Sequence, residues 1–310
     1  MSSAYANNDA AAGPEGSTSH RLAPQDYICL GYQAYMLQCA VLAPDSADAT
    51  TARWFTFALF ATTAIGLILS RGRGLLPDAW REPVYRAAVL LPVVASYAEL
   101  KVLLSSMQPH VVDHQLWAID RALFGETPSI TLAPLMTAAV TEWFAFFYYS
   151  YFPILMVVVA PALFRDEGRN MFELRMGAML VFAIGHIGYT LVPAYGPYEA
   201  ITFAHPLEGG FWWGKVLSAV HVGALMDVFP SLHTAVPTFL VLHGFAYRNT
   251  PLRRVSWLVL LFFAANIVVS TMLLRWHYAI DVLAGLALAT FARTVATKLP
   301  QDELAGKRSS

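Results

Sequence analysis

Long apolar stretches separated by short polar loops dominate the sequence. Eight of these stretches are long enough for a helix to cross about 30 Å of hydrocarbon. They cover residues 27–43, 54–70, 85–104, 142–164, 172–193, 229–247, 254–274 and 277–298. The pattern predicts an all-α polytopic membrane bundle of about eight transmembrane helices.

Three further segments are shorter or less apolar. Residues 114–125 and 209–221 are amphipathic and rich in aromatic side chains, so we expect helices that lie in the membrane interface. Residues 127–141 are moderately apolar, which predicts an interfacial or re-entrant segment. We interpret the aromatic run EWFAFFYYSYF at 142–152 as an interfacial belt rather than a lipid-recognition surface.

The order of polar and apolar segments also predicts how the chain is organised. Residues 1–26 are small and polar, which is typical of a disordered tail, and they lack the order of a signal peptide. We expect two transmembrane helices and a basic loop in 27–84, a six-helix core in 85–298 and a second tail in 299–310.

Composition strengthens the membrane interpretation. The chain is 57% hydrophobic and 13% charged, whereas soluble domains carry about 25% charged residues. The mean hydropathy is +0.50. The net charge of −1 gives no basic field that would attract nucleic acid.

Lys and Arg are distributed unevenly between the two sides of this predicted bundle. Of the 20 basic residues, 15 fall on the side of both termini, four on the other side, and Lys101 lies within the third span. Cytoplasmic loops are enriched in Lys and Arg. We therefore expect cytoplasmic termini in a bacterial inner membrane or a eukaryotic secretory-pathway membrane, with spans six and eight beginning on the periplasmic or lumenal side.

Two polar motifs stand at the outer ends of these spans, FPSLHT at 229–234 and RWHYAID at 275–281. His277 and Asp281 are spaced i, i+4, so the carboxylate can orient the imidazole. Ser231 and His233 follow Pro230 in a first helical turn, whose free N–H groups favour a phosphate. Titratable groups inside a span usually mark a site. The arrangement predicts phosphoryl transfer through a phosphohistidine.

PSLH followed by Ser270, Thr271, His277 and Asp281 resembles the second and third signature motifs of the type 2 phosphatidic acid phosphatase superfamily. The resemblance implies that His277 is the nucleophile, that Asp281 orients it, and that His233 protonates the leaving group. It also implies metal-free chemistry without a cofactor, in a six-helix phosphatase or phosphotransferase core.

The departures from that pattern indicate a branch. Thr271 replaces the usual arginine of the third motif, and no first motif Lys-x6-Arg-Pro occurs in 190–228, where VPAYGPYE stands instead. These features, with DRALFGETP at 120–128, are similar to the fungal inositol phosphorylceramide synthase branch. That branch implies transfer of a phospho-head group from a phospholipid such as phosphatidylinositol to a lipid alcohol such as ceramide, in sphingolipid metabolism.

Several side chains are candidates for holding the substrate. We expect Ser231, Thr271 and Arg275 to contact phosphate. Lys101 is also a candidate, because it is the one basic residue assigned to the interior of a predicted span rather than to one side of the membrane, and its position near the outer end lets it reach an anionic head group; the alternative is that it extends to the interface. The partial match of KVLLSSMQP at 101–109 to the first motif lies two spans too early and is more consistent with chance. The candidates for the mouth of the pocket are Tyr195, Gly196 and Tyr198. His186 and His243 are predicted to be hydrogen-bonded to neighbouring helices.

Three alternatives remain open at this stage. Water as acceptor would make the protein a lipid phosphate phosphatase acting on phosphatidic acid or a polyprenyl (di)phosphate. A non-enzymatic transporter is the second alternative. A metal site is the third, with ligands drawn from His233, His277, Asp281, His110, Asp113 and His114. The predicted partners are membrane lipids, and the oligomeric state stays open.

Overall fold

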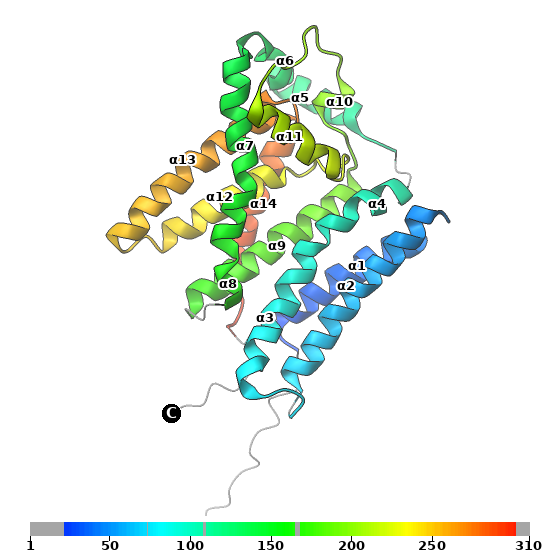
Figure 1. Cartoon of the computed structure of the whole chain (residues 1–310), viewed down its shortest axis with the longest axis vertical. Coiled ribbons are helices and arrows are strands. Elements are labelled where there is room, and N and C mark those ends of the chain that lie inside the picture. Colours follow the sequence, from blue (N-terminus) through cyan, green and yellow to red (C-terminus); the bar gives the residue numbers. More distant parts are fainter. Residues whose placement is uncertain (1–21, 73, 108–109, 165–167, 302–310) are drawn as a thin grey trace, which may run out of the picture.

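The computed structural model describes residues 22–72, 74–107, 110–164 and 168–301 (Figure 1). Within these ranges the chain forms helices and no strand, and Ala194 pairs with Asp227 in an isolated parallel bridge. The predicted all-α fold is confirmed.

The helices follow one another through the whole described chain. They are α1 (Pro24–Leu42), α2 (Ala47–Arg71), α3 (Asp78–Ala95), α4 (Tyr97–Met107), α5 (Asp113–Phe124), α6 (Pro128–Thr131), the 3-10 turn η1 (Ala133–Leu135), α7 (Ala138–Val159), α8 (Pro161–Phe164), α9 (Arg169–Leu191), α10 (Pro197–Ala200), α11 (Phe211–Val222), α12 (Leu232–Ala246), α13 (Pro251–Leu273) and α14 (Ala279–Lys298).

The predicted spans coincide with α1, α2, the pair α3 and α4, α7, α9, α12, α13 and α14. Among the described residues, α2, α9, α13 and α14 are long and apolar enough to cross a membrane. The pair α3–α4, bent by 44°, makes a fifth candidate. Pro92 lies inside α3 close to this bend, and a proline removes a helical hydrogen bond. The protein is an integral membrane protein, and the count of eight crossings stays a prediction.

The structure describes only a small part of the two segments predicted as tails. Residues 1–21 and 302–310 lie outside the described residues. Pro24 begins α1, so the last residues of the segment predicted as a tail are helical, with proline in the first turn where its missing N–H costs nothing. The predicted interfacial segments 114–125 and 209–221 correspond to α5 and α11.

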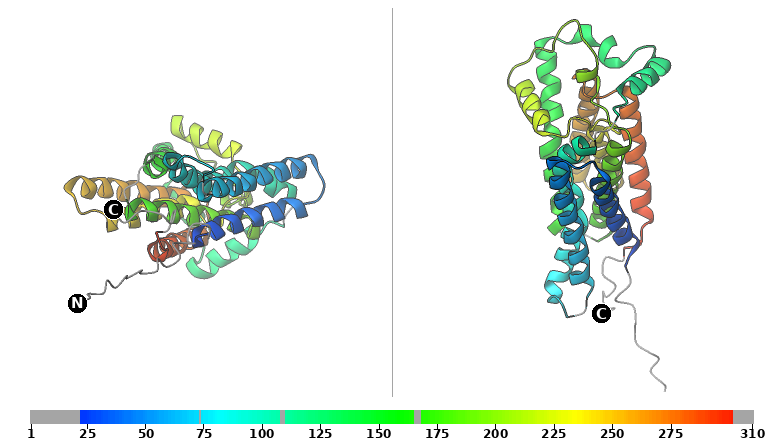
Figure 2. Two further views of the ribbon diagram at one scale, coloured as in Figure 1. Left: turned by 90° about the horizontal axis from the view of Figure 1, so that it is seen from below. Right: turned by 90° about the vertical axis from the view of Figure 1, so that its right-hand side faces the viewer.

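Helix α12 lies at the centre of the bundle and packs against α7, α9, α13 and α14. Helices α1 to α4 form a second layer, which contacts α9 (Figures 1 and 2). The short helices α5, α6, α10 and α11 gather at the upper end in Figure 1, above the N-terminal ends of α12 and α14. The site described below lies under these short helices.

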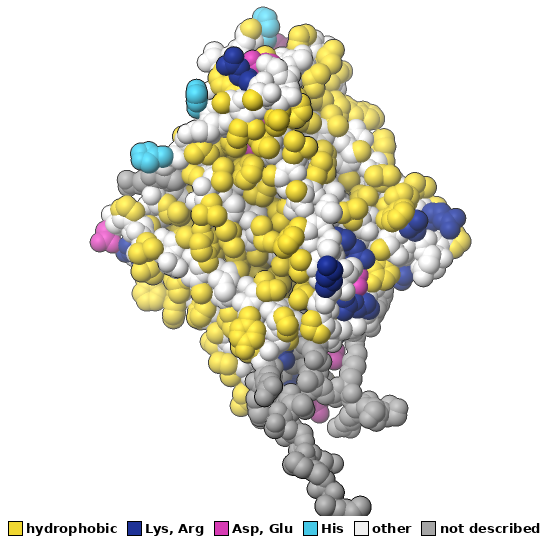
Figure 3. All heavy atoms as spheres, turned by 180° about the vertical axis from the view of Figure 1, so that it is seen from behind, with side chains coloured by type: hydrophobic (Ala, Val, Ile, Leu, Met, Phe, Trp, Pro, Cys, Tyr) yellow, Lys and Arg dark blue, Asp and Glu magenta, His cyan; other side chains and the backbone are white. Residues whose placement is uncertain are grey.

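The surface of the bundle is apolar over a broad area. Hydrophobic side chains cover most of the face in Figure 3. Large exposed apolar residues occur on most of the long helices, and α13 and α2 carry the most of them; those on the two helices include Trp54, Phe57, Ile68, Leu252, Val255 and Phe262. Such an area exceeds what a water-soluble monomer exposes and suits contact with lipid tails.

Two histidines away from the motifs are hydrogen-bonded as predicted. The Nδ1 atom of His186 lies 3.0 Å from both the Tyr32 hydroxyl and the Ser96 hydroxyl. The Nε2 atom of His243 lies 2.7 Å from Oδ1 of Asn170. Both histidines therefore join neighbouring helices.

Candidate active site

His233 is fixed by the start of α12 and by the aromatic residues of α7. Ser231 is the N-cap, and its carbonyl accepts the N–H groups of Thr234 and Ala235. The His233 ring stacks on the Tyr148 ring with centroids 4.2 Å apart and an interplanar angle of 10°. The Tyr151 ring lies at 4.2 Å and is tilted by 34°. The imidazole is thus held between two phenol rings.

His277 lies in the turn that joins α13 to α14. The Thr271 carbonyl accepts the N–H groups of both Trp276 and His277, at 2.9 and 3.1 Å. Arg275 has a φ of 68°, the left-handed conformation that reverses the chain here. This turn, and not a regular helix, holds the buried imidazole.

Asp281 lies directly behind His277. Its Oδ2 atom accepts the Tyr278 N–H at 2.8 Å, which caps the first turn of α14. The same atom lies 3.5 Å from Nδ1 of His277, beyond the usual hydrogen-bond range. The carboxylate therefore faces Nδ1 and leaves Nε2 of His277 free to act elsewhere.

Two carboxylates from an earlier part of the sequence accept hydrogen bonds from the backbone around the site. Asp120 accepts the N–H groups of Ala279 and Ile280, at 2.8 and 2.9 Å. Asp113 accepts those of Tyr195 and Gly196, at 2.9 and 2.8 Å. Anionic side chains are stabilising at helix N-termini. The α14 amides are therefore occupied by protein groups.

Helices α12 and α14 approach each other closely where the two motifs meet. The Ser231 N–H donates to the Asp281 carbonyl at 3.1 Å. A Cβ at Gly285 would lie 2.6 Å from the Ser231 carbonyl oxygen and 2.9 Å from Cβ of Thr234. Only glycine permits this separation, which brings both histidines to one place.

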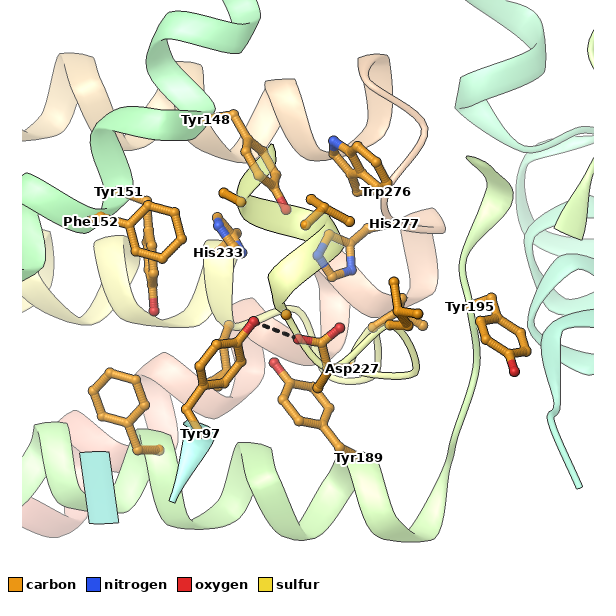
Figure 4. Close-up of a pocket in the computed structure, with 18 of the residues that line it drawn as sticks. Tyr97, Tyr148, Tyr151, Phe152, Tyr189, Tyr195, Asp227, His233, Trp276 and His277 are labelled. Carbon is orange, nitrogen blue, oxygen red and sulfur yellow. Dashed lines mark hydrogen bonds between the residues drawn. The ribbon is translucent and has the colours of Figure 1, made fainter. Parts of the chain in front are cut away.

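A cavity of about 190 Å³ opens between the two histidines (Figure 4). The rings of His233 and His277 both line it and lie side by side, with centroids 6.4 Å apart and an interplanar angle of 46°. The remaining walls are mainly aromatic and apolar; the aromatic members are Tyr97, Tyr148, Tyr151, Phe152, Phe182, Tyr189, Tyr195 and Trp276. The two histidines predicted to be catalytic therefore line the same cavity.

Asp227 is the acidic group nearest the histidines in this cavity. Its Oδ2 atom accepts a hydrogen bond of 3.0 Å from the Tyr97 hydroxyl. In Figure 4 it lies below His277, beside Tyr189. Burial raises the pKa of the Asp227 carboxyl, and the bond from Tyr97 opposes that rise.

The predicted phosphate-binding residues surround the cavity without lining it. Ser231 and Thr271 are fully buried. The Ser231 hydroxyl has no partner in the described part of the chain, whereas the Thr271 hydroxyl donates to Val268 within α13. Arg275 donates to the His205 carbonyl and stacks 3.8 Å from the Phe203 ring. The role of these residues stays a prediction.

Lys101 and the three residues predicted at the mouth of the pocket lie in different parts of the structure. Lys101 donates to the His221 carbonyl at 2.8 Å, near the end of α11. Tyr195 lines the cavity, and Tyr198 lines a shallow groove beside it. Gly196 has a φ of 84° and packs against the Trp276 carbonyl, where a side chain would clash.

Several lining residues carried no clear signal in the sequence. Tyr148 and Tyr151 belong to the run interpreted as an interfacial belt, yet both are buried beside His233. Tyr97 lies one helical turn before Lys101 on α4. Asp227 stands two residues before FPSLH, and this position next to the motif is the one hint that could have identified it.

The described residues also bear on the metal site that the sequence left as an alternative. Within the described ranges, no three His, Cys, Asp or Glu side chains come together as candidate ligands. Asp113 instead binds backbone amides and accepts a 3.1 Å bond from the Tyr278 hydroxyl.

Comparison with known proteins adds the family. The family model described as the PAP2 superfamily matches residues 114–295, which contain α5 to α13, most of α14 and both histidine motifs. Neither a curated protein nor a solved structure matches the chain. The family match covers more than half of the sequence and both histidine motifs, whereas Tyr97 of the cavity wall lies before it. The chain therefore belongs to the PAP2 superfamily.

Proposed function

We propose that this protein is a membrane lipid phosphotransferase that works through a phosphohistidine on His277. The observation that carries the proposal is the pair of imidazoles that line one cavity, with centroids 6.4 Å apart, and with Asp281 behind one of them. Membership of a family of phosphatases and phosphotransferases supports the same chemistry.

In the first half-reaction, Nε2 of His277 attacks the phosphorus of a phospholipid. The bond from phosphorus to the lipid oxygen breaks, and protonated His233 gives its proton to that oxygen, so that a lipid alcohol leaves. Asp281 stabilises the positive charge that develops on the His277 ring. The phospho-head group is then bound to His277.

The second half-reaction reverses these roles. The hydroxyl of an acceptor lipid attacks the phosphorus while neutral His233 takes its proton. The bond between phosphorus and Nε2 breaks, which restores both histidines. We expect the N–H groups of Leu232 and His233, which line the cavity at the start of α12, to meet the negative charge on the phosphate oxygens. The Ser231 hydroxyl lies behind this lining and has no partner in the described chain, so it contributes only if it turns toward the phosphate.

The walls of the cavity favour a lipid alcohol over water as acceptor. Apolar side chains such as Val94, Leu155 and Phe182 line it together with the aromatic rings. A dry site protects a reactive intermediate from hydrolysis. Phosphatidylinositol and ceramide are the donor and acceptor that the sequence resemblance implies. Hydrolysis of phosphatidic acid or a polyprenyl (di)phosphate is the competing activity.

We infer that the site faces the periplasm or lumen and that both termini are cytoplasmic. The distribution of Lys and Arg carries this inference. The helices α5, α10 and α11 cover the site at the upper end in Figure 1, and the described ends of α1 and α14 lie toward the lower end. Cysteine labelling of intact cells or sealed vesicles at exposed Glu199 and at Arg248 would test the orientation.

The decisive experiment is product analysis by mass spectrometry. Purified protein in lipid nanodiscs is incubated with phosphatidylinositol, phosphatidic acid, phosphatidylethanolamine and ceramide. Transfer yields a phosphorylated acceptor lipid and a lipid alcohol, whereas hydrolysis yields no phosphorylated acceptor. We expect His277→Ala to lower turnover at least about 10³-fold and Asp281→Asn about 10²- to 10⁴-fold. Near wild-type turnover in a folded His277→Ala protein would refute the mechanism.

A further inference from the structure

The cavity is built for an anion, yet its lining contains no Lys or Arg. The charged members of its walls, apart from the two histidines, are the carboxylates Asp227 and Glu199. The Glu199 side chain is exposed, whereas Asp227 is partly buried and lies near His277 (Figure 4). The protein therefore places negative charge next to the position where a phosphate must bind.

Asp227 is held in this position beside the two histidines and forms no ion pair with a Lys or Arg in the described part of the chain. Its backbone pairs with Ala194, and its carboxylate accepts the Tyr97 hydroxyl at 3.0 Å. No ion pair joins it to a described Lys or Arg. A half-buried carboxylate with one neutral donor keeps most of its negative charge uncompensated.

A phosphate on His277 would be repelled by the Asp227 carboxylate. Two negative charges a few ångströms apart repel strongly where the surroundings are apolar. A neutral head group leaves the repulsion between the phosphate and the Asp227 carboxylate unchanged, and an anionic head group increases it. A positively charged group next to the phosphate removes it, because the cation lies between the phosphate and the carboxylate.

The rings around Asp227 are suited to such a cation. Tyr97 and Tyr189 flank the carboxylate, and Tyr148 and Trp276 line the wall nearer the histidines (Figure 4). Aromatic faces attract ammonium groups, and cages of several rings bind quaternary ammonium ligands. A carboxylate combined with aromatic rings is the usual composition of these sites.

We propose that the head group carried by the phosphorus is a phosphorylated amino alcohol, and that Asp227 binds its ammonium group. The donor would then be a zwitterionic phospholipid of the ethanolamine or choline class. This assignment rests on the proposed phosphotransfer at His277, and it differs from the inositol that the resemblance implies. Asp227 acts here as a specificity-determining residue.

A donor competition tests the assignment. The full-length protein in nanodiscs receives phosphatidylethanolamine, phosphatidylcholine, phosphatidylinositol and phosphatidylglycerol with identical acyl chains, and ceramide or diacylglycerol as acceptor. We expect a zwitterionic donor to be used at least about tenfold faster than the two anionic donors. Asp227→Asn should reduce that preference about tenfold by raising KM for the zwitterionic donor.

Three control variants separate charge recognition from packing. Tyr97→Phe removes the hydrogen bond to Asp227 and keeps the aromatic ring, so the donor preference should persist. Asp227→Glu keeps the charge and should retain part of the preference. Glu199→Gln removes a carboxylate at the mouth and should change the preference less than Asp227→Asn does. Size-exclusion chromatography and thermal unfolding establish that each variant is folded.

The outcomes separate this assignment from the proposed function. Preference for phosphatidylinositol or phosphatidylglycerol, with turnover that depends on His277, would overturn the amine assignment and leave phosphotransfer intact. An equal loss of turnover for all donors in Asp227→Asn would also overturn the amine assignment. Turnover that does not require His277 would refute the proposed function instead.

Discussion

Asp120 caps the helix that carries Asp281, because its carboxylate accepts the N–H groups of Ala279 at 2.8 Å and Ile280 at 2.9 Å. The carboxylate is fully buried and also accepts the Thr127 hydroxyl at 2.7 Å. A residue of α5 thereby fixes the first turn of α14, where Tyr278 and Asp281 lie next to His277.

Asp120→Ala should therefore weaken both the fold and the site. We expect the free energy of unfolding to fall by about 2 kcal/mol, since a buried charged cap is lost. Turnover should also fall, because the turn that holds His277 is released. Thermal unfolding in detergent and a lipid transfer assay measure the two effects. Asp78→Ala is the control, because Asp78 is exposed. Unchanged melting and turnover in Asp120→Ala would contradict the assignment.

The role of His233 as proton donor can be tested with two leaving groups. His233→Gln should slow transfer from a natural lipid, whose alkoxide leaves poorly, by about 10²- to 10⁴-fold. An aryl phosphodiester with a nitrophenol leaving group needs no proton, so its first half-reaction should slow much less. Rapid-quench measurement of the first turnover gives both rates. Equal losses for both substrates would mean that His233 does not protonate the leaving group.

Gly285 sets the separation between the two histidine motifs. Gly285→Ala places a methyl group against the Ser231 carbonyl, so α12 and α14 must move apart. Overpacking of this kind costs about 1–3 kcal/mol, and the melting temperature should fall accordingly. Gly31→Ala in α1 is the matched control, since a Cβ there meets nothing within 4 Å. An equal effect of the two substitutions would show that the close approach is not needed.

The Asp227 carboxyl is expected to make the free energy of unfolding depend on pH. Burial raises the pKa of its carboxyl in the folded protein, so the folded state binds the proton more tightly than the unfolded state. The resulting stabilisation is present below the unfolded pKa of about 3.9 and is lost as pH rises through the folded pKa. Asp227→Asn should therefore raise the melting temperature relative to wild type more at pH 7.5 than at pH 4. A constant difference in melting temperature across pH would contradict the prediction.

The sequence was sufficient to predict the helices and the two central motifs. Apolar length identified the segments that became α2, α9, α13 and α14. The i, i+4 spacing of His277 and Asp281 identified two residues that lie together, although His277 belongs to the turn before α14 and not to the helix itself. Both signals depend only on neighbours in the chain.

The rest of the site depends on contacts between distant segments. Asp120 and Asp113 bind amides 159 and 82 residues away, at Ala279 and Tyr195, and no local pattern indicates such pairs. Tyr148 and Tyr151 are aromatic residues in an apolar helix, and a lipid-facing belt has the same composition. Their burial follows from how α7 packs on α12, which hydropathy does not report.

The stacking of His233 between two phenol rings has a consequence for which lipids can react. An imidazole clamped at 4.2 Å from both Tyr148 and Tyr151 cannot swing to follow its substrate. In the proposed mechanism His233 is the proton donor, so each lipid must bring its leaving oxygen to one fixed point beside this ring. We therefore expect branching on the first carbon of the leaving alcohol to slow the transfer, because that carbon must fit beside Tyr148 and Tyr151.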